Sequence, residues 1–207
     1  MTLVKHRLVF RGLAVVVSWG VVGILQADVK MPSVFGDHMV LQQEAALPVW
    51  GTADAGEKVM VSVGGKQGNA TADADGKWLV KLDPLPTGTS PVTMTVTGKN
   101  TVKFDDVLVG EVWFCSGQSN MAFNFARTDQ AAADTAKAND PQMRYFHVSG
   151  SPGLEPSSSF ACGKWEICTP EVASLYSGVA YFFGRELRGR LNRPVGLMTG
   201  FTHLNSD

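Results

Sequence analysis

The sequence predicts a β-sandwich domain followed by the N-terminal part of a three-layer α/β domain. From roughly residue 28 to residue 106, short alternating strands are separated by turn residues, which is typical of a β-sandwich. From residue 107 onward, strands alternate with helical segments, which indicates a parallel sheet with helices on its faces. The second part begins with a buried strand that ends abruptly at the turn Gly117-Gln118-Ser119-Asn120.

The N-terminal segment, residues 1–27, has the layout of a secretory signal peptide. Basic residues between Lys5 and Arg11 precede an apolar core at residues 12–25, and Ala27 offers a cleavage site before Asp28. An uncleaved membrane anchor is the alternative, but a span needs roughly 20 apolar residues and this core is shorter. We therefore expect an exported protein, periplasmic or extracellular, with no membrane span after cleavage.

Five segments carry the strand pattern of the first domain, residues 28–106. Residues 58–63 alternate so that three valines share one face, and residues 92–97 alternate in the same way. The segment 73–76 has the Asp and Gly residues that tight turns need. The predicted strands are 47–50, 58–63, 78–82, 92–97 and 101–104.

The second domain, residues 107–207, reads as strand, helix, strand, helix, strand. The predicted strands are 107–115, 143–148 and 195–198, the predicted helices are 122–138 and 172–191, and residues 149–161 form a loop. The expected apolar face of the second helix comprises Val179, Phe182, Phe183, Leu187 and Leu191. This alternation of strands and helices is the start of a parallel sheet with helices on its faces.

Ser119 has the setting that a serine nucleophile needs. Gly117 allows a sharp turn after the strand, and Ser119 is expected where the strand gives way to a helix. A hydroxyl there lies beside backbone N–H groups that stabilise negative charge. A simpler interpretation is that Ser119 and Asn120 cap a helix. The spacing also differs from the nucleophile elbow of the α/β-hydrolases, because Met121 replaces its second glycine.

The longer run around this turn resembles a known family. Residues 110–113 (GEVW) and 115–121 (CSGQSNM) resemble the first block of the SGNH (GDSL-like) hydrolases in its sialate O-acetylesterase form. Other parts of the chain resemble the same family: residues 32–42 (PSVFGDHMVLQ), 47–51 (LPVWG), 73–78 (DADGKW), 179–187 (VAYFFGREL) and 193–197 (RPVGL). The resemblance covers nearly the whole chain.

This resemblance implies a flavodoxin-like SGNH hydrolase domain and an esterase that hydrolyses acetyl esters on sugars. It implies that Ser119 is the nucleophile and that its backbone N–H belongs to the oxyanion hole. Gln118 and Asn120 are the implied substrate-binding residues. The implied partner is an O-acetylated sugar or polysaccharide, with no metal and no cofactor. The sequence does not specify which sugar is deacetylated.

The sequence departs from the family pattern after Met198. The family's Ser-Trp-Gly-Gly-Thr turn, its later Asn block and its Asp-x-x-His block have no counterpart in residues 199–207. None of the four histidines, which are His6, His38, His147 and His203, matches the family's base. The incomplete motif set predicts an inactive or truncated form, and a frame-shifted product and a natural short variant both stay open.

Net charge and cysteine content limit the partners and disulfides that the chain can have. The net charge of −1 gives no basic surface for nucleic acid. Of the three cysteines, Cys115 is expected to pack in the buried strand, while Cys162 and Cys168 either close a short disulfide loop or stay unpaired. Two other functions are open: a carbohydrate-binding module that uses Trp50 and Trp78 as platforms for sugar rings, and a gene remnant without a function.

Overall fold

Strands make up most of the architecture. The computed structural model describes residues 28–148 and 163–201. Its eight-stranded sheet follows the order β4 (Lys66–Thr71), β3 (Lys58–Val63), β6 (Gly88–Thr97), β7 (Thr101–Gly117), β10 (Val195–Phe201), β8 (Asp140–His147) and β9 (Trp165–Cys168), and β1 (Val40–Gln42) also pairs with β7. A separate two-stranded sheet joins β2 (Leu47–Thr52) and β5 (Lys77–Leu82). The chain is therefore a mostly-sheet, mixed α/β protein.

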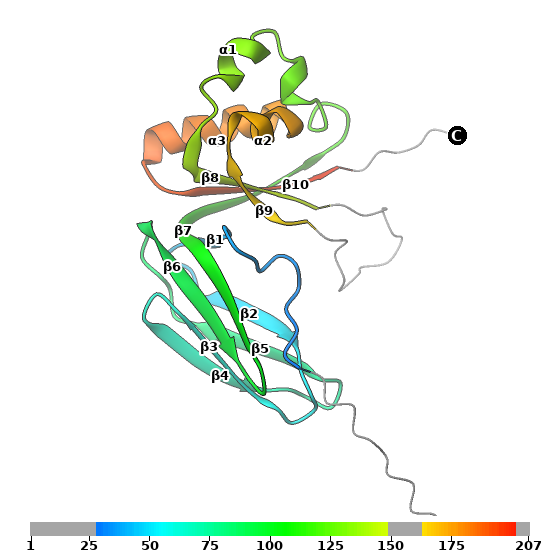
Figure 1. Ribbon diagram of the computed structural model, residues 1–207, viewed down its shortest axis with the longest axis vertical. Helices are drawn as coiled ribbons and strands as arrows, with labels where there is room; N and C mark the ends of the chain where they lie inside the picture. Colours follow the sequence, from blue (N-terminus) through cyan, green and yellow to red (C-terminus); the bar gives the residue numbers. More distant parts are fainter. Residues whose placement is uncertain (1–27, 149–162, 202–207) are drawn as a thin grey trace, which may run out of the picture.

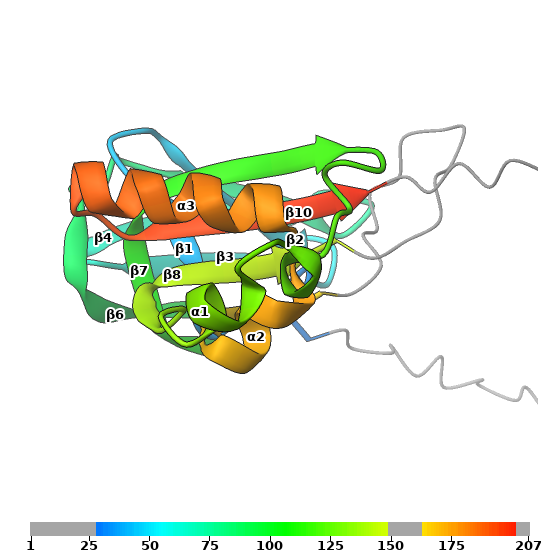
Figure 2. The ribbon, with the colours of Figure 1, turned by 90° about the horizontal axis from the view of Figure 1, so that it is seen from above.

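Four short and medium helices complete the fold. They are η1 (Phe125–Arg127), α1 (Ala131–Thr135), α2 (Pro170–Leu175) and α3 (Gly178–Leu191). All four lie over the part of the large sheet that contains β8 and β10 (Figure 1). Seen from above, α3 runs along β10, while α1 and α2 lie on the other side of β8 from α3 (Figure 2).

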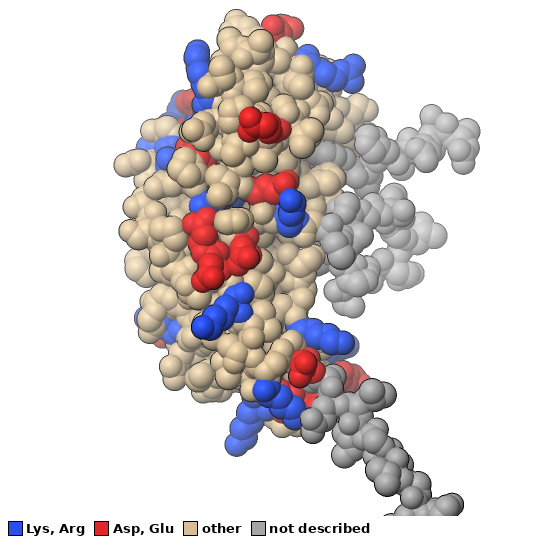
Figure 3. Space-filling view, in the orientation of Figure 1, with Lys and Arg blue, Asp and Glu red and all other residues tan. Residues whose placement is uncertain are grey.

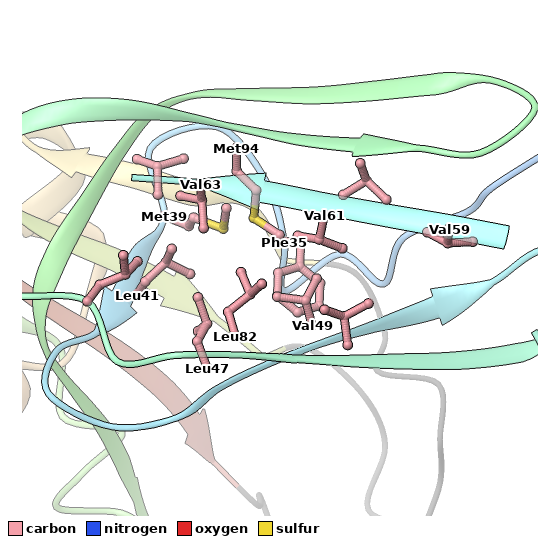
Figure 4. Close-up of a cluster of buried hydrophobic side chains, with 14 of the residues drawn as sticks. Phe35, Met39, Leu41, Leu47, Val49, Val59, Val61, Val63, Leu82 and Met94 are labelled. Carbon is pink, nitrogen blue, oxygen red and sulfur yellow. The ribbon is translucent and has the colours of Figure 1, made fainter. Parts of the chain in front are cut away.

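The first hydrophobic core lies between the two sheets of the N-terminal part. β3 and β5 alternate between buried and exposed side chains, as the sequence pattern predicts. The inward side chains come from β2, β3, β5 and β6 and point toward one another across the gap between the sheets (Figure 4). Each large aliphatic side chain buried in this way contributes about 1.5–3 kcal/mol. Every strand predicted for residues 28–106 is present.

Two strands of this part were missed by the sequence analysis. β4 (KQGNAT) has no apolar alternation, and its side chains are half-buried or exposed. It becomes a strand because it pairs antiparallel with β3, from Lys58 opposite Thr71 to Val63 opposite Lys66. β1 has only three residues and pairs parallel with a strand about 68 positions further along the chain, Val40 opposite Leu108. Pairing across such a separation leaves no local sequence signal.

β7 connects the two parts of the fold. Its first half pairs antiparallel with β6, and its second half pairs parallel with β10, Glu111 opposite Val195. The strand continues through residues 106 and 107, where the sequence predicts a boundary between domains 28–106 and 107–207. That division stays a prediction. Residues 1–27 and the export expected from them lie outside the described part of the chain.

In the parallel part of the sheet, the last strand in the chain is the central one. β10 lies between β7 and β8, so β8, which ends at His147, is not a neighbour of β7. The residues of β10 pair on both sides, with Thr199 opposite Cys115 of β7 and opposite His147 of β8. Both neighbours run parallel to β10, so the carboxyl ends of all three strands meet at one edge of the sheet.

Helices cover one face of this sheet, although a three-layer domain would have them on both. The side chains of Met143, Tyr145 and Leu197 pack under the helices. Phe146 and Trp165 instead join the core of the N-terminal part, and the Trp165 indole donates to the carbonyl of Val34 at 2.8 Å. Within the described residues the third layer is therefore replaced by β1 and the segment before it.

The helix predicted over residues 122–138 is not continuous. Only η1 and α1 form within it, separated by residues 128–130. The Asn124 side chain accepts from the N–H of Ala126, and the Phe125 N–H donates to the carbonyl of Tyr176 at 2.9 Å. These contacts tie the segment to the α2–α3 junction. Helical turns this short gain little from propensity alone, so packing decides their length.

The helix predicted over residues 172–191 is two helices, α2 and α3. Thr169 caps α2, with Pro170 at its first position, and Ser177 caps α3 by accepting from the Ala180 N–H at 3.2 Å. Both Thr-Pro and Ser-Gly are start signals that the sequence contains. Asn192 ends α3 in the left-handed conformation, at φ 48°.

The buried face of α3 was predicted only in part, since Phe182 and Leu187 are partly buried and pack against the core. Its fully buried residues are Gly178, Ala180, Tyr181 and Gly184, while Val179, Phe183 and Leu191 are exposed. A Cβ at Gly184 would lie 2.6 Å from the Leu197 side chain, so the helix approaches β10 too closely for a larger residue. Small residues therefore face the sheet, and three of the five large apolar residues that the periodicity placed inward remain at the surface.

A buried ion pair joins the two parts of the chain beside β7. Arg144 of β8 contacts the Asp106 carboxylate through two nitrogens, at 3.0 and 3.2 Å, and its side chain is 3% exposed. The ring of His38 lies 2.7 Å from the same carboxylate. Burial lowers the pKa of Arg144, although Asp106 acts in the opposite direction. We call these three residues the Asp106 cluster.

Among the described residues, the second half of β7 has a strand on one side only. After Gly110, which pairs with Gln42 of β1, β10 is its only partner in residues 28–148 and 163–201. Trp113 and Phe114 are 43% and 62% exposed there, and the Trp113 ring lies 5.2 Å from that of Phe183. An apolar strand edge of this kind is a template for pairing with another chain.

Phe114→Lys is expected to reduce self-association of the protein. A charge on the free edge of β7 disfavours edge-to-edge pairing, and Phe114 is too exposed to contribute much to the core. Light scattering of concentrated samples measures the effect. Leu175→Lys is the matched control, because Leu175 is a 73% exposed apolar residue on α2. An equal reduction by both variants would contradict a specific role of the β7 edge.

Surface charge is mixed. On the face shown in Figure 3, Lys and Arg side chains lie among Asp and Glu side chains, and much of the surface is uncharged. None of the helices in residues 28–148 and 163–201 is long and apolar enough to cross a membrane.

Candidate active site

Ser119 lies in an exposed turn at the carboxyl end of β7. The strand ends at Gly117, and Gln118, Ser119 and Asn120 are all exposed. The N–H of Ala122 donates to the carbonyl of Gln118 at 2.8 Å, which closes a single helical turn. The predicted change from strand to helix at this point is thus a change from strand to turn. The turn nevertheless presents the three predicted site residues together at the sheet edge.

The backbone of this turn offers hydrogen-bond donors. Within the described residues, the N–H groups of Ser119, Asn120 and Met121 donate to no acceptor, whereas those of Ala122 and Phe123 are paired. The Gln118, Ser119 and Asn120 side chains likewise have no hydrogen-bond partner in this part of the structure. Unpaired backbone N–H groups beside a serine hydroxyl can stabilise an oxyanion that forms on the attacked carbonyl.

Met121 anchors the turn to the helices. Its sulfur accepts from the buried hydroxyl of Ser177 at 3.5 Å, and a Cβ added at Gly117 would lie 3.0 Å from the Met121 Cβ. The Gly178 N–H donates to the carbonyl of Phe123 at 2.8 Å. The cap of α3 therefore holds the segment that follows Ser119. Sequence reasoning missed Ser177, although Ser-Gly before an apolar run is a helix-start signal.

Cys115 packs on the helix side of the sheet, four residues before Ser119. It is 8% exposed, and burial raises the pKa of its thiol above the ordinary value. A protonated, buried thiol is a poor nucleophile. Cys115 therefore has the packing role that the sequence predicts, and Ser119 is the exposed nucleophile candidate of this strand.

His147 is the described histidine nearest to the carboxyl edge of the sheet. Its Nδ1 lies 3.2 Å from the hydroxyl of Thr199, the β10 residue that also pairs with Cys115. Two strand spacings, about 10 Å, therefore separate the backbones of His147 and Cys115. His147 shares the edge with Ser119 but is oriented toward β10. The other described histidine, His38, belongs to the Asp106 cluster.

The structure describes only some of the cysteines and histidines that the sequence analysis considered. Cys168 is buried, its Sγ lies 3.7 Å from the carbonyl of Ala138, and burial raises its pKa to about 11. Cys162, His6 and His203 lie outside the described residues, so the pairing of Cys162 with Cys168 stays a prediction. In the described part of the chain, no three His, Cys, Asp or Glu side chains are placed to hold a metal ion.

Comparisons with known proteins identify relatives of this chain. No protein-family model matches it. The sialate O-acetylesterases of Rattus norvegicus and Homo sapiens are each 30% identical to it, over 82% of the chain and over 35% and 36% of their own lengths. A solved carbohydrate acetylesterase from Xanthomonas citri is 34% identical with a TM-score of 0.81, over 84% of this chain and 40% of that one. The chain thus spans little more than a third of its curated relatives.

Proposed function

The chain belongs to the sialate O-acetylesterase family, and we propose that it is the nucleophile-bearing part of an esterase that removes acetyl groups from sugars. The exposed Ser119 hydroxyl beside unpaired backbone N–H groups is the observation that carries this proposal. In this proposal, residues 28–106 are a β-sandwich and residues 107–207 are part of an SGNH hydrolase domain. The 0.81 TM-score to a carbohydrate acetylesterase supports both assignments.

Ser119 is the nucleophile in the reaction that we propose. Its Oγ attacks the acetyl carbonyl carbon, and the carbonyl oxygen gains negative charge that the Ser119 N–H stabilises. The bond between the carbonyl carbon and the sugar oxygen then breaks, and the sugar leaves as an alcohol after accepting a proton. Water hydrolyses the acetyl–Ser119 ester, which releases acetate and restores the hydroxyl. In this proposal, Gln118 and Asn120, which are exposed on either side of Ser119, contact the sugar.

This mechanism also requires a base, which the turn around Ser119 does not supply. A serine hydroxyl at its ordinary pKa reacts slowly until a neighbouring base removes its proton. Neither described histidine is hydrogen-bonded to Ser119, since His38 contacts Asp106 and His147 lies against Thr199. We therefore propose that the chain of 207 residues has little esterase activity without further groups.

Acetate release from an acetylated oligosaccharide tests this proposal. The 207-residue chain is expected to release acetate no faster than its Ser119→Ala variant, because loss of the base costs on the order of a millionfold in turnover. Circular dichroism of both proteins checks that they are equally folded. Ser119-dependent release well above background would contradict the expectation and would show that the chain supplies a base. His147 and His203 would then be substituted first.

The substrate of the proposed reaction is an O-acetylated sugar or polysaccharide. The rat and human relatives are sialate O-acetylesterases, and the Xanthomonas citri relative is a carbohydrate acetylesterase. Acetylated sialic acid and acetylated plant-type oligosaccharides are the two substrate classes to compare in the assay. The mixed surface charge supports a sugar rather than a nucleic acid as the partner.

A further inference from the structure

A cavity lies on the N-terminal part of the fold, on strands that do not carry Ser119. It measures about 660 Å³ and is bounded by residues 30–33, by β2 and β5, and by the end of β4. Cavities of roughly 300–1,000 Å³ are the usual size for small-molecule sites. None of the residues of the turn around Ser119 lines it, so it is a separate site.

Trp50 presents its indole at this cavity. On β2 the inward positions are Leu47, Val49 and Gly51, so Trp50 faces outward and is 37% exposed. The ring of Phe35 packs against it, 4.8 Å away at an angle of 74°. Phe35 therefore restricts the orientation of the Trp50 ring, which is not part of the hydrophobic core. A rigid, exposed indole binds ligands at a low cost in conformational entropy.

Trp78 forms an inner part of the same cavity because residue 51 is a glycine. A Cβ at Gly51 would lie 2.8 Å from the Trp78 ring and 2.3 Å from the carbonyl of Lys30. Only glycine thus allows the Trp78 ring to lie this close to β2. The Trp78 indole N–H is buried and has no acceptor among the described residues. Unpaired buried donors are rare in folded proteins and call for an explanation.

Polar groups surround the two indoles. Thr52 and Thr71 line the cavity, and so do Lys30 and Lys77, neither of which forms an ion pair in the described part of the chain. Hydroxyl and ammonium groups donate hydrogen bonds to ligand oxygens. An aromatic platform with hydrogen-bond donors around it matches a pyranose ring, which has apolar C–H faces and hydroxyls at its rim. Such a site suits a sugar better than a purely apolar ligand.

We propose that this cavity binds a sugar unit, with the ring stacked on Trp50. The sugar would be a unit of the carbohydrate that carries the acetyl ester, an assignment that rests on the proposed function. Binding itself does not depend on that function, because no residue of the cavity takes part in the chemistry at Ser119. The site would hold the polymer on the protein while acetyl groups are removed elsewhere on it.

Titration of the full chain with two probes tests the proposal. A neutral xylo-oligosaccharide and sialyllactose represent uncharged and acidic sugars, and calorimetry measures the dissociation constant. We expect saturable binding of at least one probe, unchanged in Ser119→Ala, and weakened by at least about tenfold in Trp50→Ala. Salt-sensitive binding of sialyllactose alone would indicate that Lys30 and Lys77 contact its carboxylate. Ser119-dependent acetate release well above background, with sugar binding unchanged, would contradict only the expectation that the chain has little esterase activity.

Two controls separate binding from folding. Trp50→Phe keeps a ring against Phe35 and should bind with an intermediate affinity, and Trp113→Ala removes an exposed indole outside the cavity and should bind normally. In the unsubstituted chain, the indole N–H signal of Trp50 in the NMR spectrum should shift during the titration. Absence of saturable binding of both probes, or equal binding by Trp50→Ala with an unmoved Trp50 signal, would overturn the proposal.

Discussion

Asp106→Ala is expected to lower the free energy of unfolding by about 3–5 kcal/mol. The Arg144 side chain is 3% exposed, and its guanidinium contacts the Asp106 carboxylate at 3.0 and 3.2 Å. Removal of Asp106 leaves this charge buried without its closest partner. Burial lowers the pKa of Arg144, because the buried guanidinium lacks the water that would stabilise its charge. In the variant, water therefore does not replace the lost Asp106 carboxylate. Urea unfolding followed by circular dichroism measures the change.

The position of the Asp106 cluster makes this effect a global one. Asp106 lies on β7 and Arg144 on β8, and these strands are not neighbours in the sheet. His38, from the segment before β1, contacts the same carboxylate at 2.7 Å. The cluster therefore holds three segments that come from both predicted domains. We expect one cooperative unfolding transition in the wild type and a lower midpoint in the variant.

Asp105→Ala is the matched control for this experiment. Asp105 is the neighbouring aspartate, but it is exposed, and its carboxylate accepts from the Thr93 hydroxyl at 2.8 Å. Its loss should cost no more than about 1 kcal/mol. The double variant Asp106→Ala, Arg144→Met should recover part of the free energy of unfolding that Asp106→Ala loses, because it also removes the unpaired Arg144 charge. Equal destabilisation by Asp105→Ala and Asp106→Ala would contradict the role given to the buried ion pair.

The strands of the first part other than β1 and β4 could be predicted because each leaves a local pattern. In β3 and β5, burial on one face alone requires that apolar residues alternate with polar ones. The abrupt end of β7 at Gly117 could be predicted for a similar reason, since a glycine and polar residues follow a buried run. Exposure of Ser119 follows from that same local signal.

Features that depend on distant partners could not be predicted. The position of β10 between β7 and β8 is set by pairing across dozens of residues, and no local pattern encodes it. The inward face of α3 is set by how closely β10 approaches Gly184, which periodicity cannot indicate. The partnership of Asp106 with Arg144 likewise joins residues 38 positions apart. Each of these outcomes requires the three-dimensional arrangement of the neighbouring element.

The position of the candidate nucleophile could be predicted from the sequence, but the contact that anchors its turn could not. Ser119, Gln118 and Asn120 lie together because they are consecutive in one turn. Ser177, which donates to Met121 and so anchors that turn, is 56 residues further along the chain. Its role depends on the break between α2 and α3, which a single predicted helix over 172–191 concealed.

A chimera allows the role of Ser119 to be measured in a complete fold. In this chimera, the present chain replaces the matched 40% of the Xanthomonas citri carbohydrate acetylesterase. The TM-score of 0.81 and the 34% identity indicate that the backbones superpose well enough for the remaining part to pack on it. Burial of Trp113, Phe114 and Phe183 by that part should reduce self-association relative to the chain alone. Acetate release from acetylated oligosaccharides is the readout of activity.

Ser119→Ala in this chimera is expected to reduce kcat by about a millionfold. The variant removes the Oγ atom that we propose as the nucleophile but leaves the backbone N–H groups of the turn in place. KM should change little, because the variant keeps Gln118 and Asn120, the residues that we propose contact the sugar. Ser116→Ala is the matched control, since Ser116 is an exposed serine on β7 outside the turn, and it should retain nearly full activity. If Ser119→Ala retained activity while Ser116→Ala lost it, the nucleophile would have to be reassigned.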